Sequence, residues 1–376
     1  MRVAIVSGIW PPDAGGPASH APALADFLAA RGHGVEVVTT ADAPPATRPY
    51  PVSWVPRRIP PGLRHVRCVL AVHSSAARAD VVYATSMIRR AALGSRTAGR
   101  PLVVKLVSDE VFERARRSGR FDGPLDEFQR VGGLRNRFLR ATRTVALRGA
   151  AHVFSPSAYL RDVALGWGLD ARRIEVLPNP APDVPPLPSR EALRAELGLE
   201  GDVLAFAGRL GRQKGLGVAL EALAAVPGVT LAIAGGGPDR WPLERRADEL
   251  GLGGRVRFLG SLPRDEVLRV FRAADASLLP STWENFPHTV VESLAVGTPV
   301  IATSVGGVPE AVRDGENGLL VPPGDAAALA AAVRRFFDEE TVRHALSAAA
   351  APSVASSTEE AVFARIEQAL EDVARR

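Results

Sequence analysis

The chain has 376 residues, of which 46% are apolar and 23% charged, a balance typical of a soluble globular protein with two cores. It contains no run of 18 apolar residues, which excludes a membrane-spanning helix, and its first residues lack the length and cleavage site of a signal peptide, so we expect a cytoplasmic protein. Its single cysteine, Cys68, excludes an internal disulfide and is expected to be a core thiol in a reducing compartment.

Charge is unevenly distributed along the chain. Residues 1–185 hold 26 Lys and Arg against 15 Asp and Glu, a net charge of +11, and the remainder holds 20 against 26, a net charge of −6. A basic half beside an acidic half indicates an anionic partner on one side. Aromatic residues make up only 6% and are not interleaved with the basic ones, so nucleic acid is not the expected partner.

Short apolar runs alternate with helical patterns through the first half of the chain. Strands are expected at 3–6, 35–39, 52–55, 81–83, 102–106, 152–154 and 174–177. Helices are expected between most of them, at 19–31, 63–78, 87–98, 125–148 and 157–167. This alternation predicts a parallel sheet covered by helices on both faces.

A proline-rich segment separates the two halves. Residues 178–188 hold six prolines in eleven positions, which is incompatible with a helix or a central strand and predicts an interdomain linker. Beyond it the pattern restarts, with strands expected at 203–207, 230–234, 256–259, 276–279 and 299–302. Helices are expected at 216–225, 240–250, 265–273, 289–295, 326–337, 341–350 and 359–374. The chain is therefore predicted to form two doubly wound α/β units, in which ligands bind beyond the carboxyl ends of the strands.

A glycine pair, Gly15-Gly16, follows the first expected strand and precedes a helix. Such a loop frees backbone N–H groups for an anion, although a plain connecting loop is the alternative. The surrounding residues match neither Gly-x-Gly-x-x-Gly nor a P-loop, which argues against a dinucleotide dehydrogenase and a P-loop nucleotidase.

The second half begins with a strand and the segment Gly208-Arg-Leu-Gly-Arg-Gln-Lys-Gly215. Arg209 and Lys214 thus flank a glycine-rich turn just before a helix, which is an arrangement suited to a diphosphate, although a solvated basic loop is the alternative. Gly235 opens a second glycine-rich loop after a strand, and Gly306 opens a third. Several glycine-rich loops at the carboxyl ends of strands in one domain indicate an anion-binding site more specifically than any single loop does.

Two glutamates, Glu284 and Glu292, lie eight residues apart after the apolar strand at 276–279. Glu284 is expected in a polar loop and Glu292 inside the helix that follows, with about two turns of helix between them. The carboxylates would then lie roughly 10–12 Å apart, too far to share one proton and suited to a long hydroxyl-rich ligand. Capping or surface acids are the alternative. The chain has no Asp-x-Asp, no His/Cys cluster with ligand spacing and no Gly-x-Ser-x-Gly, so neither a metal site nor a serine hydrolase is expected.

Three segments together resemble a known family. The motifs Gly208-Arg-Leu-x-x-x-Lys-Gly215, Ser281-x-x-Glu-x-Phe-x-x-x-x-x-Glu-Ser-Leu-Ala-x-Gly-Thr-Pro-Val-Ile and Gly306-Gly-Val-Pro-Glu-x-Val-x-Asp-Gly-x-Asn-Gly-Leu-Leu-Val resemble the family 4 glycosyltransferases, which are retaining enzymes of the GT-B fold that use nucleotide-diphosphate sugars. The resemblance implies two Rossmann-like domains facing a cleft: an acceptor-binding domain, 1–183, and a donor-binding domain, 184–352. A C-terminal helix within 353–376 would pack back on the first domain.

The resemblance also implies roles for individual residues. Arg209 and Lys214 would hold the donor diphosphate, Glu284 would bond the sugar hydroxyls, and Glu292 would bond the ribose. The catalytic set would be Arg209, Lys214, Glu284 and Asp109, with His20 and Lys105 at the acceptor. The donor-binding set would comprise Gly15, Gly16, Gly208, Gly235, Asn285, Phe286, Thr289, Val290 and Glu292.

The sequence departs from the family in the loop after the fifth strand. Many members have a histidine there, whereas this chain reads Lys105-Leu-Val-Ser-Asp-Glu-Val-Phe-Glu113, with Asp109 about where the histidine would be. Asp109 could contact the sugar, orient the acceptor or cap a turn, and the sequence leaves these roles open. A second departure, His288, is assigned no role.

The function implied by the resemblance is metal-independent transfer of a sugar, with retained configuration and same-face attack, to a glycan, a lipid-linked glycan or a small metabolite, as in bacterial polysaccharide biosynthesis. No cofactor is expected beyond the sugar nucleotide. Arginines crowd segment 113–148, which indicates peripheral contact with anionic membrane or, alternatively, a solvated helix. A nucleotide-sugar epimerase of similar fold and a catalytically inactive sugar-nucleotide-binding protein are the alternative functions.

Overall fold

The computed structural model describes residues 1–11, 13 and 16–376, with the backbone alone for 16–18. The chain divides into two compact units, one formed by Met1–Pro178 with Glu360–Arg376 and the other by Asn179–Glu359. The sequence predicted the corresponding boundaries after residues 183 and 352, five and seven residues from these positions.

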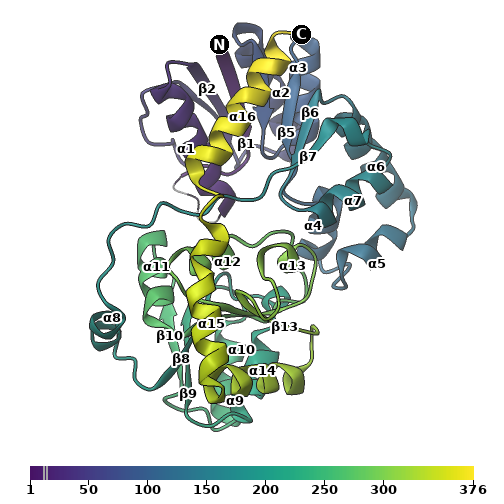
Figure 1. The fold of residues 1–376 in the computed structure, drawn as a ribbon. Coiled ribbons are helices and arrows are strands. Elements are labelled where there is room, and N and C mark those ends of the chain that lie inside the picture. Colours follow the sequence, from purple (N-terminus) through teal and green to yellow (C-terminus); the bar gives the residue numbers. More distant parts are fainter. Residues whose placement is uncertain (12, 14–15) are drawn as a thin grey trace. The chain divides into compact units, whose positions relative to one another are not determined.

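The first unit is built on a seven-stranded sheet in the order β3-β2-β1-β4-β5-β6-β7, with every pair of neighbours parallel (Figure 1). The strands are β1 (Arg2–Ser7), β2 (Gly34–Ala41), β3 (Val52–Pro56), β4 (Val81–Ala84), β5 (Leu102–Lys105), β6 (His152–Ser155) and β7 (Ile174–Val176). The central strands are continuous apolar runs because both faces of the sheet are covered by helices.

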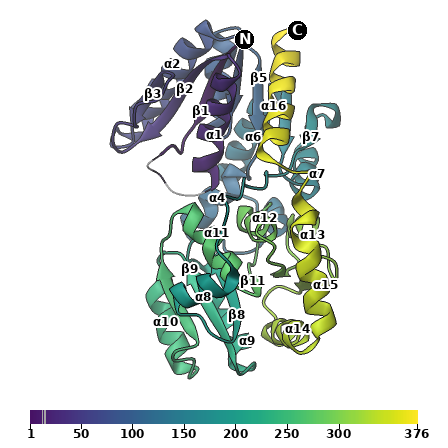
Figure 2. The same ribbon diagram turned by 60° about the vertical axis from the view of Figure 1, so that its left-hand side comes forward.

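Helices pack on both faces of this sheet. They are α1 (Gly16–Ala30), α2 (Pro61–Arg78), α3 (Ile88–Thr97), α4 (Glu110–Arg117), α5 (Leu125–Arg130), α6 (Leu134–Arg148), α7 (Ala158–Gly166) and α16 (Glu359–Ala374), with a short 3₁₀ helix at Ala171–Arg173. On one face, Val3 and Ile5 share a buried cluster with α1 and α16. On the other, α2 contacts β2 and β3 (Figure 2). Helix α3 contacts β4 and β5. The C-terminal helix therefore completes the first unit, as predicted.

The second unit contains a six-stranded parallel sheet in the order β10-β9-β8-β11-β12-β13. Its strands are β8 (Asp202–Ala207), β9 (Val229–Ala234), β10 (Val256–Gly260), β11 (Ala276–Leu279), β12 (Val300–Thr303) and β13 (Gly318–Val321). The order runs outward in both directions from the neighbours β8 and β11, so the crossovers reverse there. This reversal is the switch point at which such sheets bind ligands.

The helices of the second unit are α8 (Arg190–Leu197), α9 (Leu216–Ala224), α10 (Arg240–Glu249), α11 (Arg264–Ala273), α12 (His288–Ala295), α13 (Val308–Ala311), α14 (Ala326–Asp338) and α15 (Glu340–Ala350), with 3₁₀ helices at Arg212–Lys214 and Pro352–Val354. Alternate residues of β8 face opposite layers, since Leu204 and Phe206 pack with α9 and α14, whereas Val203 and Ala205 pack with α8 and α11. Both faces of this sheet are therefore covered.

The structure differs from the sequence prediction in a few short elements. The helix expected at 125–148 is two helices, α5 and α6, because Gly133 between them adopts a positive φ of 102° that a helix cannot contain. Helices α4 and α8 and strand β13 were not predicted. All three are short, and α4 and α8 begin at the capping residues Asp109 and Ser189.

No helix among the described residues combines the length and apolar character that crossing a bilayer requires.

Candidate functional site

The loops that leave the carboxyl ends of β8 and β9 are bonded directly to each other. The Gly208 N–H donates to the Ala234 carbonyl at 2.9 Å, and the Leu210 N–H donates to the Gly236 carbonyl at 2.9 Å. A Cβ at Gly235 would lie only 1.9 Å from the Gly208 carbonyl oxygen. Only glycine permits this approach, which brings both backbones together at the edge of the sheet.

The loop after β11 is held against the 3₁₀ helix Arg212–Lys214. The Thr282 N–H donates to the Gln213 carbonyl at 2.8 Å, and the Gln213 side-chain amide donates to the Trp283 carbonyl at 2.7 Å. Gly215 has a φ of 64°, and a Cβ there would lie 2.0 Å from the Pro280 carbonyl oxygen. Segments 70 residues apart in sequence therefore form one rigid edge.

This edge brings Lys214 and Glu284 into contact. Lys214 Nζ lies 2.5 Å from Glu284 Oε1, and the Ser281 hydroxyl donates to the same oxygen at 2.7 Å. The Glu284 residue is 7% exposed. Its second carboxylate oxygen, Oε2, has no hydrogen-bond partner among the described residues. The Lys214 ammonium is therefore bound to a carboxylate, that of Glu284, which can still accept a further hydrogen bond.

Arg209 differs from Lys214 in having an exposed guanidinium without a hydrogen-bond or ion-pair partner in the described part of the chain. It follows Gly208 directly, at the carboxyl end of β8. An exposed guanidinium here can bind an anion without first breaking an internal ion pair.

The start of α12 contributes backbone groups to the same edge. Pro287 precedes the helix and no side chain caps it. The Val290 N–H donates to the Pro287 carbonyl at 3.3 Å, whereas the Thr289 N–H has no partner among the described residues and can meet an acceptor. Thr289 and Val290 belong to this first turn, and the buried Asn285 and Phe286 precede it. The placement expected for Glu284, in the loop after β11, and for Glu292, in the helix that follows, is confirmed. Two full turns of helix do not separate them, because α12 begins only at His288.

Glu292 is held by an arginine that the sequence analysis missed. Arg264 Nε lies 3.0 Å from Glu292 Oε1, and Arg264 Nη1 lies 3.2 Å from Glu359 Oε1. Burial raises the pKa of Glu292, and the Arg264 charge and hydrogen bond oppose that rise. The signal that could have revealed Arg264 is its position at the start of a helix, one residue after the loop 260–263.

The residues predicted in the first unit fall in different environments. Gly15 lies outside the described residues, and Gly16 is the first residue of α1. His20 is buried, with its Nε2 3.1 Å from the Tyr83 hydroxyl and its ring edge-on to Phe363. The His20 ring is thus packed into the core between β4 and α16.

Lys105 ends β5 as a buried cation. It is 1% exposed, and its Nζ has no hydrogen-bond partner among the described residues. Burial lowers the pKa of Lys105 from its usual value of 10.5 to about 7. An amine that is partly neutral near pH 7 is uncommon in a structural position.

Asp109 is fully buried and has partners on both carboxylate oxygens. Oδ1 accepts the Val111 N–H at 2.9 Å and caps α4, and Oδ2 accepts from Arg143 at 2.6 Å and from Gln129 at 3.3 Å. Arg143 in turn stacks on Trp167, with its guanidinium carbon 3.5 Å from the ring centroid. The sequence left three roles open for Asp109, and the structure shows one of them, the N-terminal cap of α4. Contact with a substrate stays a prediction.

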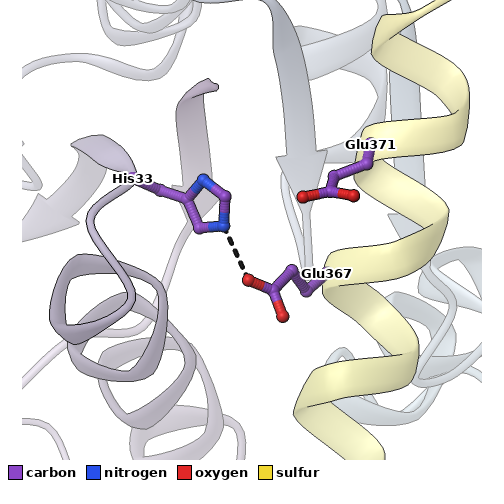
Figure 3. A group of neighbouring side chains, drawn as sticks. All are labelled: His33, Glu367 and Glu371. Atoms are coloured by element: carbon purple, nitrogen blue, oxygen red, sulfur yellow. Dashed lines mark hydrogen bonds and ion pairs between the residues drawn. The ribbon is translucent and has the colours of Figure 1, made fainter.

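One group of described residues has the composition of a metal site. Ligand atoms of His33, Glu367 and Glu371 lie within 4.8 Å of one another (Figure 3). His33 Nε2 lies 2.6 Å from Glu367 Oε1, and Arg31 Nε donates to the same carboxylate at 2.9 Å. Burial raises the pKa of Glu367, but the bonds from His33 and Arg31 outweigh it and leave the pKa lowered. The contacts of His33 and Arg31 with Glu367 tie α16 to the turn before β2.

Comparisons with known proteins cover most of the chain. Residues 15–180 match the family model described as "Glycosyl transferase 4-like domain", and residues 189–352 match "Glycosyl transferases group 1". The chain belongs to the GT-B glycosyltransferases of the family 4 type. The resemblance inferred from the motifs is therefore confirmed, and so is the fold class.

Curated relatives of this family member are glycosyltransferases. A D-inositol 3-phosphate glycosyltransferase of Mycolicibacterium smegmatis is 44% identical over 162 residues, 40% of this chain and 37% of that protein. Its Mycobacterium bovis counterpart is 44% identical over 171 residues, 43% of this chain and 35% of that protein. The matched region thus spans little more than a third of the length of these relatives.

Solved structures share the whole fold. Sucrose-phosphate synthase from Thermosynechococcus elongatus has a TM-score of 0.82 at 22% identity, over 99% of this chain and 98% of that one. Anabaena HepE in complex with UDP-glucose has a TM-score of 0.78 at 23% identity, over 99% of this chain and 100% of that one. At such identities the likeness establishes the fold, and the roles of individual site residues stay predictions.

Proposed function

We propose that the protein transfers a sugar from a nucleotide-diphosphate sugar to an acceptor hydroxyl. The observation that carries the proposal is the cluster of Lys214, Glu284 and Ser281, with the unpartnered Arg209 on the same edge of the sheet. A diphosphate needs fixed positive charge, and a sugar needs hydrogen-bond acceptors for its hydroxyls. The second unit supplies both at the carboxyl ends of its strands.

Each group has a role in this proposal. Arg209 and Lys214 bind the diphosphate, and the start of α12 adds the positive end of its helix dipole. Glu284 accepts from sugar hydroxyls through the oxygen that Lys214 and Ser281 leave unoccupied. Glu292, oriented by Arg264, accepts from the ribose hydroxyls.

We infer that the transfer retains configuration and needs no metal ion. The chain has no Asp-x-Asp, so the arginine and lysine charges would stabilise the departing diphosphate. In same-face attack, the acceptor oxygen bonds to the anomeric carbon while the bond to the phosphate oxygen breaks. That phosphate oxygen takes the acceptor proton, and no protein base is required.

The names of the relatives suggest which substrates to test first. HepE was solved with UDP-glucose, so a UDP-sugar is the first donor to test. An inositol phosphate is the first small acceptor to test, because the curated relatives carry that name. A glycan or lipid-linked glycan made in bacterial polysaccharide biosynthesis is the larger alternative. We also propose a cytoplasmic protein in peripheral contact with anionic membrane, because the first 185 residues carry a net charge of +11.

The contacts in the first unit count against a sugar-nucleotide epimerase. Such an enzyme needs an acid and a base facing the sugar, and the candidates are Asp109, Glu110 and His20. All three are engaged, with Arg143, Arg89 and Tyr83 respectively. Donor turnover without an acceptor would favour the epimerase, and tight donor binding without transfer would favour an inactive binding protein.

The test combines binding with turnover. Thermal-shift screening against a panel of nucleotide sugars identifies the donor, because a bound ligand stabilises the folded state by mass action. Transfer is then measured for Arg209→Ala, Lys214→Ala and the control Arg212→Ala, an exposed arginine of the same loop. We expect the first two to lose about 3–4 kcal/mol of transition-state stabilisation, or 10²–10³-fold in turnover, and the control to lose little. Near-normal turnover in both would refute the diphosphate assignment.

A further inference from the structure

Three helices of the first unit form a surface without acidic residues. Helices α2, α3 and α6 contain eleven arginines and no Asp or Glu. Helix α3 packs against both α2 and α6, so the three form one continuous layer. Helices of ordinary composition mix both signs of charge, and this layer does not.

Few of these arginines are neutralised by neighbouring elements. Three pair with carboxylates from elsewhere in the unit, namely Arg78 with Glu36, Arg89 with Glu110, and Arg143 with Asp109. The other eight have no carboxylate within ion-pair distance among the described residues. Those that are also solvent-exposed include Arg67, Arg96, Arg135, Arg137 and Arg148. The layer therefore keeps a strong positive charge in the folded protein.

An apolar groove lies within the same layer. Its volume is about 1110 Å³, and no acidic residue lines it. Five of the apolar side chains that line it are between 51% and 67% exposed, and they are Val66, Leu70, Leu93, Phe138 and Val145. Arg89, Arg90, Arg96 and Arg100 line the same groove. Exposed apolar residues gathered in one groove indicate a binding surface.

The arginine charge around the groove discriminates between two possible binding partners, a second copy of the chain and a lipid bilayer. A second copy docked through a two-fold axis would place the same uncompensated arginines against each other, which is unfavourable. A lipid bilayer with anionic headgroups matches both features, because phosphates meet the guanidinium groups while the interfacial acyl region receives the apolar side chains.

We propose that the groove between α2, α3 and α6 is the surface by which the protein docks on an anionic phospholipid membrane. The inference rests on the proposed membrane contact, and it states which surface makes that contact and how the surface binds. Arginine charge brings the layer to the surface, and Leu70, Leu93 and Phe138 insert at the level of the headgroups. Binding therefore has a salt-sensitive part from the arginines and a salt-resistant part from the apolar residues.

The test is co-sedimentation with phosphatidylcholine vesicles that contain or lack phosphatidylglycerol. Leu70→Glu with Phe138→Glu removes apolar insertion, and both positions are exposed, so the fold should persist. The matched control is Trp241→Glu, an 80% exposed apolar residue of the second unit. Arg96→Glu with Arg137→Glu removes charge, with Arg245→Glu of the second unit as its control. Circular dichroism and donor-induced thermal shifts check folding of each variant.

We expect the wild type to bind vesicles that contain the anionic lipid much more tightly than vesicles of phosphatidylcholine alone. The charge variant should lose at least tenfold in affinity at low salt, at about fivefold per basic residue. The apolar variant should lose the binding that survives high salt, and both controls should bind as the wild type does.

Groove variants that bind as tightly as the wild type would overturn the inference and leave membrane contact elsewhere. A wild type that binds no vesicles would refute the proposed contact itself. A dimer that is detected by light scattering and dissociated by Phe138→Glu would assign the groove to a second copy and overturn the inference. Transfer to a soluble acceptor, measured without vesicles, should be unchanged in every variant. This assay therefore distinguishes a failure of the proposed sugar transfer from a failure of the proposed membrane docking.

Discussion

Lys105 gives a quantitative test of the first unit. Its side chain is 1% exposed at the end of β5, and burial lowers the pKa of its amine from 10.5 to about 7. The unfolded chain keeps its proton up to about pH 10.4. Between pH 7 and 10 the unfolded state therefore binds more protons than the folded state, and the free energy of unfolding rises with pH in that window. The cost of burying this lysine is complete below pH 7 and vanishes above its unfolded pKa.

The magnitude follows from the two pKa values. The interval from 10.5 to about 7 corresponds to about 5 kcal/mol at 1.36 kcal/mol per pH unit. Replacing Lys105 by methionine keeps an unbranched apolar chain and removes the charge. We expect Lys105→Met to be more stable than the wild type by about 4 kcal/mol at pH 7 and by about 1 kcal/mol at pH 9.5. The stability difference between the variant and the wild type should thus fall by about 3 kcal/mol from pH 7 to pH 9.5. This fall does not depend on any change in packing energy caused by methionine, because such a change is the same at both pH values.

The composition of the chain allows the titration to be observed directly. The only lysines are Lys105 and Lys214, so a protein labelled with ¹³C in its lysine side chains gives two Cε resonances. The Lys105→Met variant assigns them by the loss of one signal. We expect the Lys105 resonance to titrate near pH 7. Urea unfolding at pH 7 and 9.5 then measures the stability difference, with the exposed Arg67→Met as a control whose effect should not depend on pH.

Two results would refute this reasoning. A Lys105 resonance that does not move between pH 6 and 9 would exclude the lowered pKa. A Lys105→Met variant whose stability difference from the wild type is equal at both pH values would exclude the linkage. If the variant is stabilised but no longer transfers sugar while still binding the donor, a group kept at a cost in stability is best explained by function at the acceptor.

Further substitutions test the remaining contacts. Gly235→Ala places a methyl group 1.9 Å from a backbone oxygen, so we expect about 2–4 kcal/mol lower stability and weaker donor binding, and an unchanged thermal-shift response would contradict this. Arg264→Ala leaves Glu292 without its cation, so we expect about 1–2 kcal/mol lower stability and roughly tenfold higher KM for the donor, with kcat changed less. Asp109→Ala leaves Arg143 buried and unpaired, which should lower the free energy of unfolding by about 3–5 kcal/mol, whereas Asp109→Asn keeps the cap and should lose less. Loss of transfer in Asp109→Asn with unchanged urea unfolding would show instead that the carboxylate acts on substrate.

The fold was largely predictable from local patterns. Parallel strands buried on both faces leave continuous apolar runs, and these runs marked every strand except β13. The helix predicted at 125–148 was wrong in its middle, because arginines recur on both sides of Gly132 and Gly133 whereas the helical backbone stops there, with Gly133 at a φ of 102°. Short helices such as α4 carry too few residues for a periodic signal, and their caps are visible only once the helix is known.

The site was predictable only in part, for a different reason. Motif spacing placed Arg209, Lys214 and Glu284 near the carboxyl ends of strands, where the topology brings them to one edge. Spacing along the sequence carries no information on pairing across the sheet. The Lys214–Glu284 contact and the Arg264–Glu292 contact join residues 70 and 28 positions apart, so both required the fold.

The Lys214–Glu284 contact also bears on how the proposed donor would be received. A lysine ammonium has three protons, and the bond to Glu284 uses one of them. Lys214 can therefore hold Glu284 and still donate to a phosphate, while Glu284 keeps Oε2 for a sugar hydroxyl. The ion pair then fixes the distance between the phosphate-binding and the sugar-binding group before the donor arrives. On this argument Glu284→Gln should weaken donor binding less than it weakens turnover, because the neutral amide keeps an acceptor oxygen but no longer holds the ammonium in place.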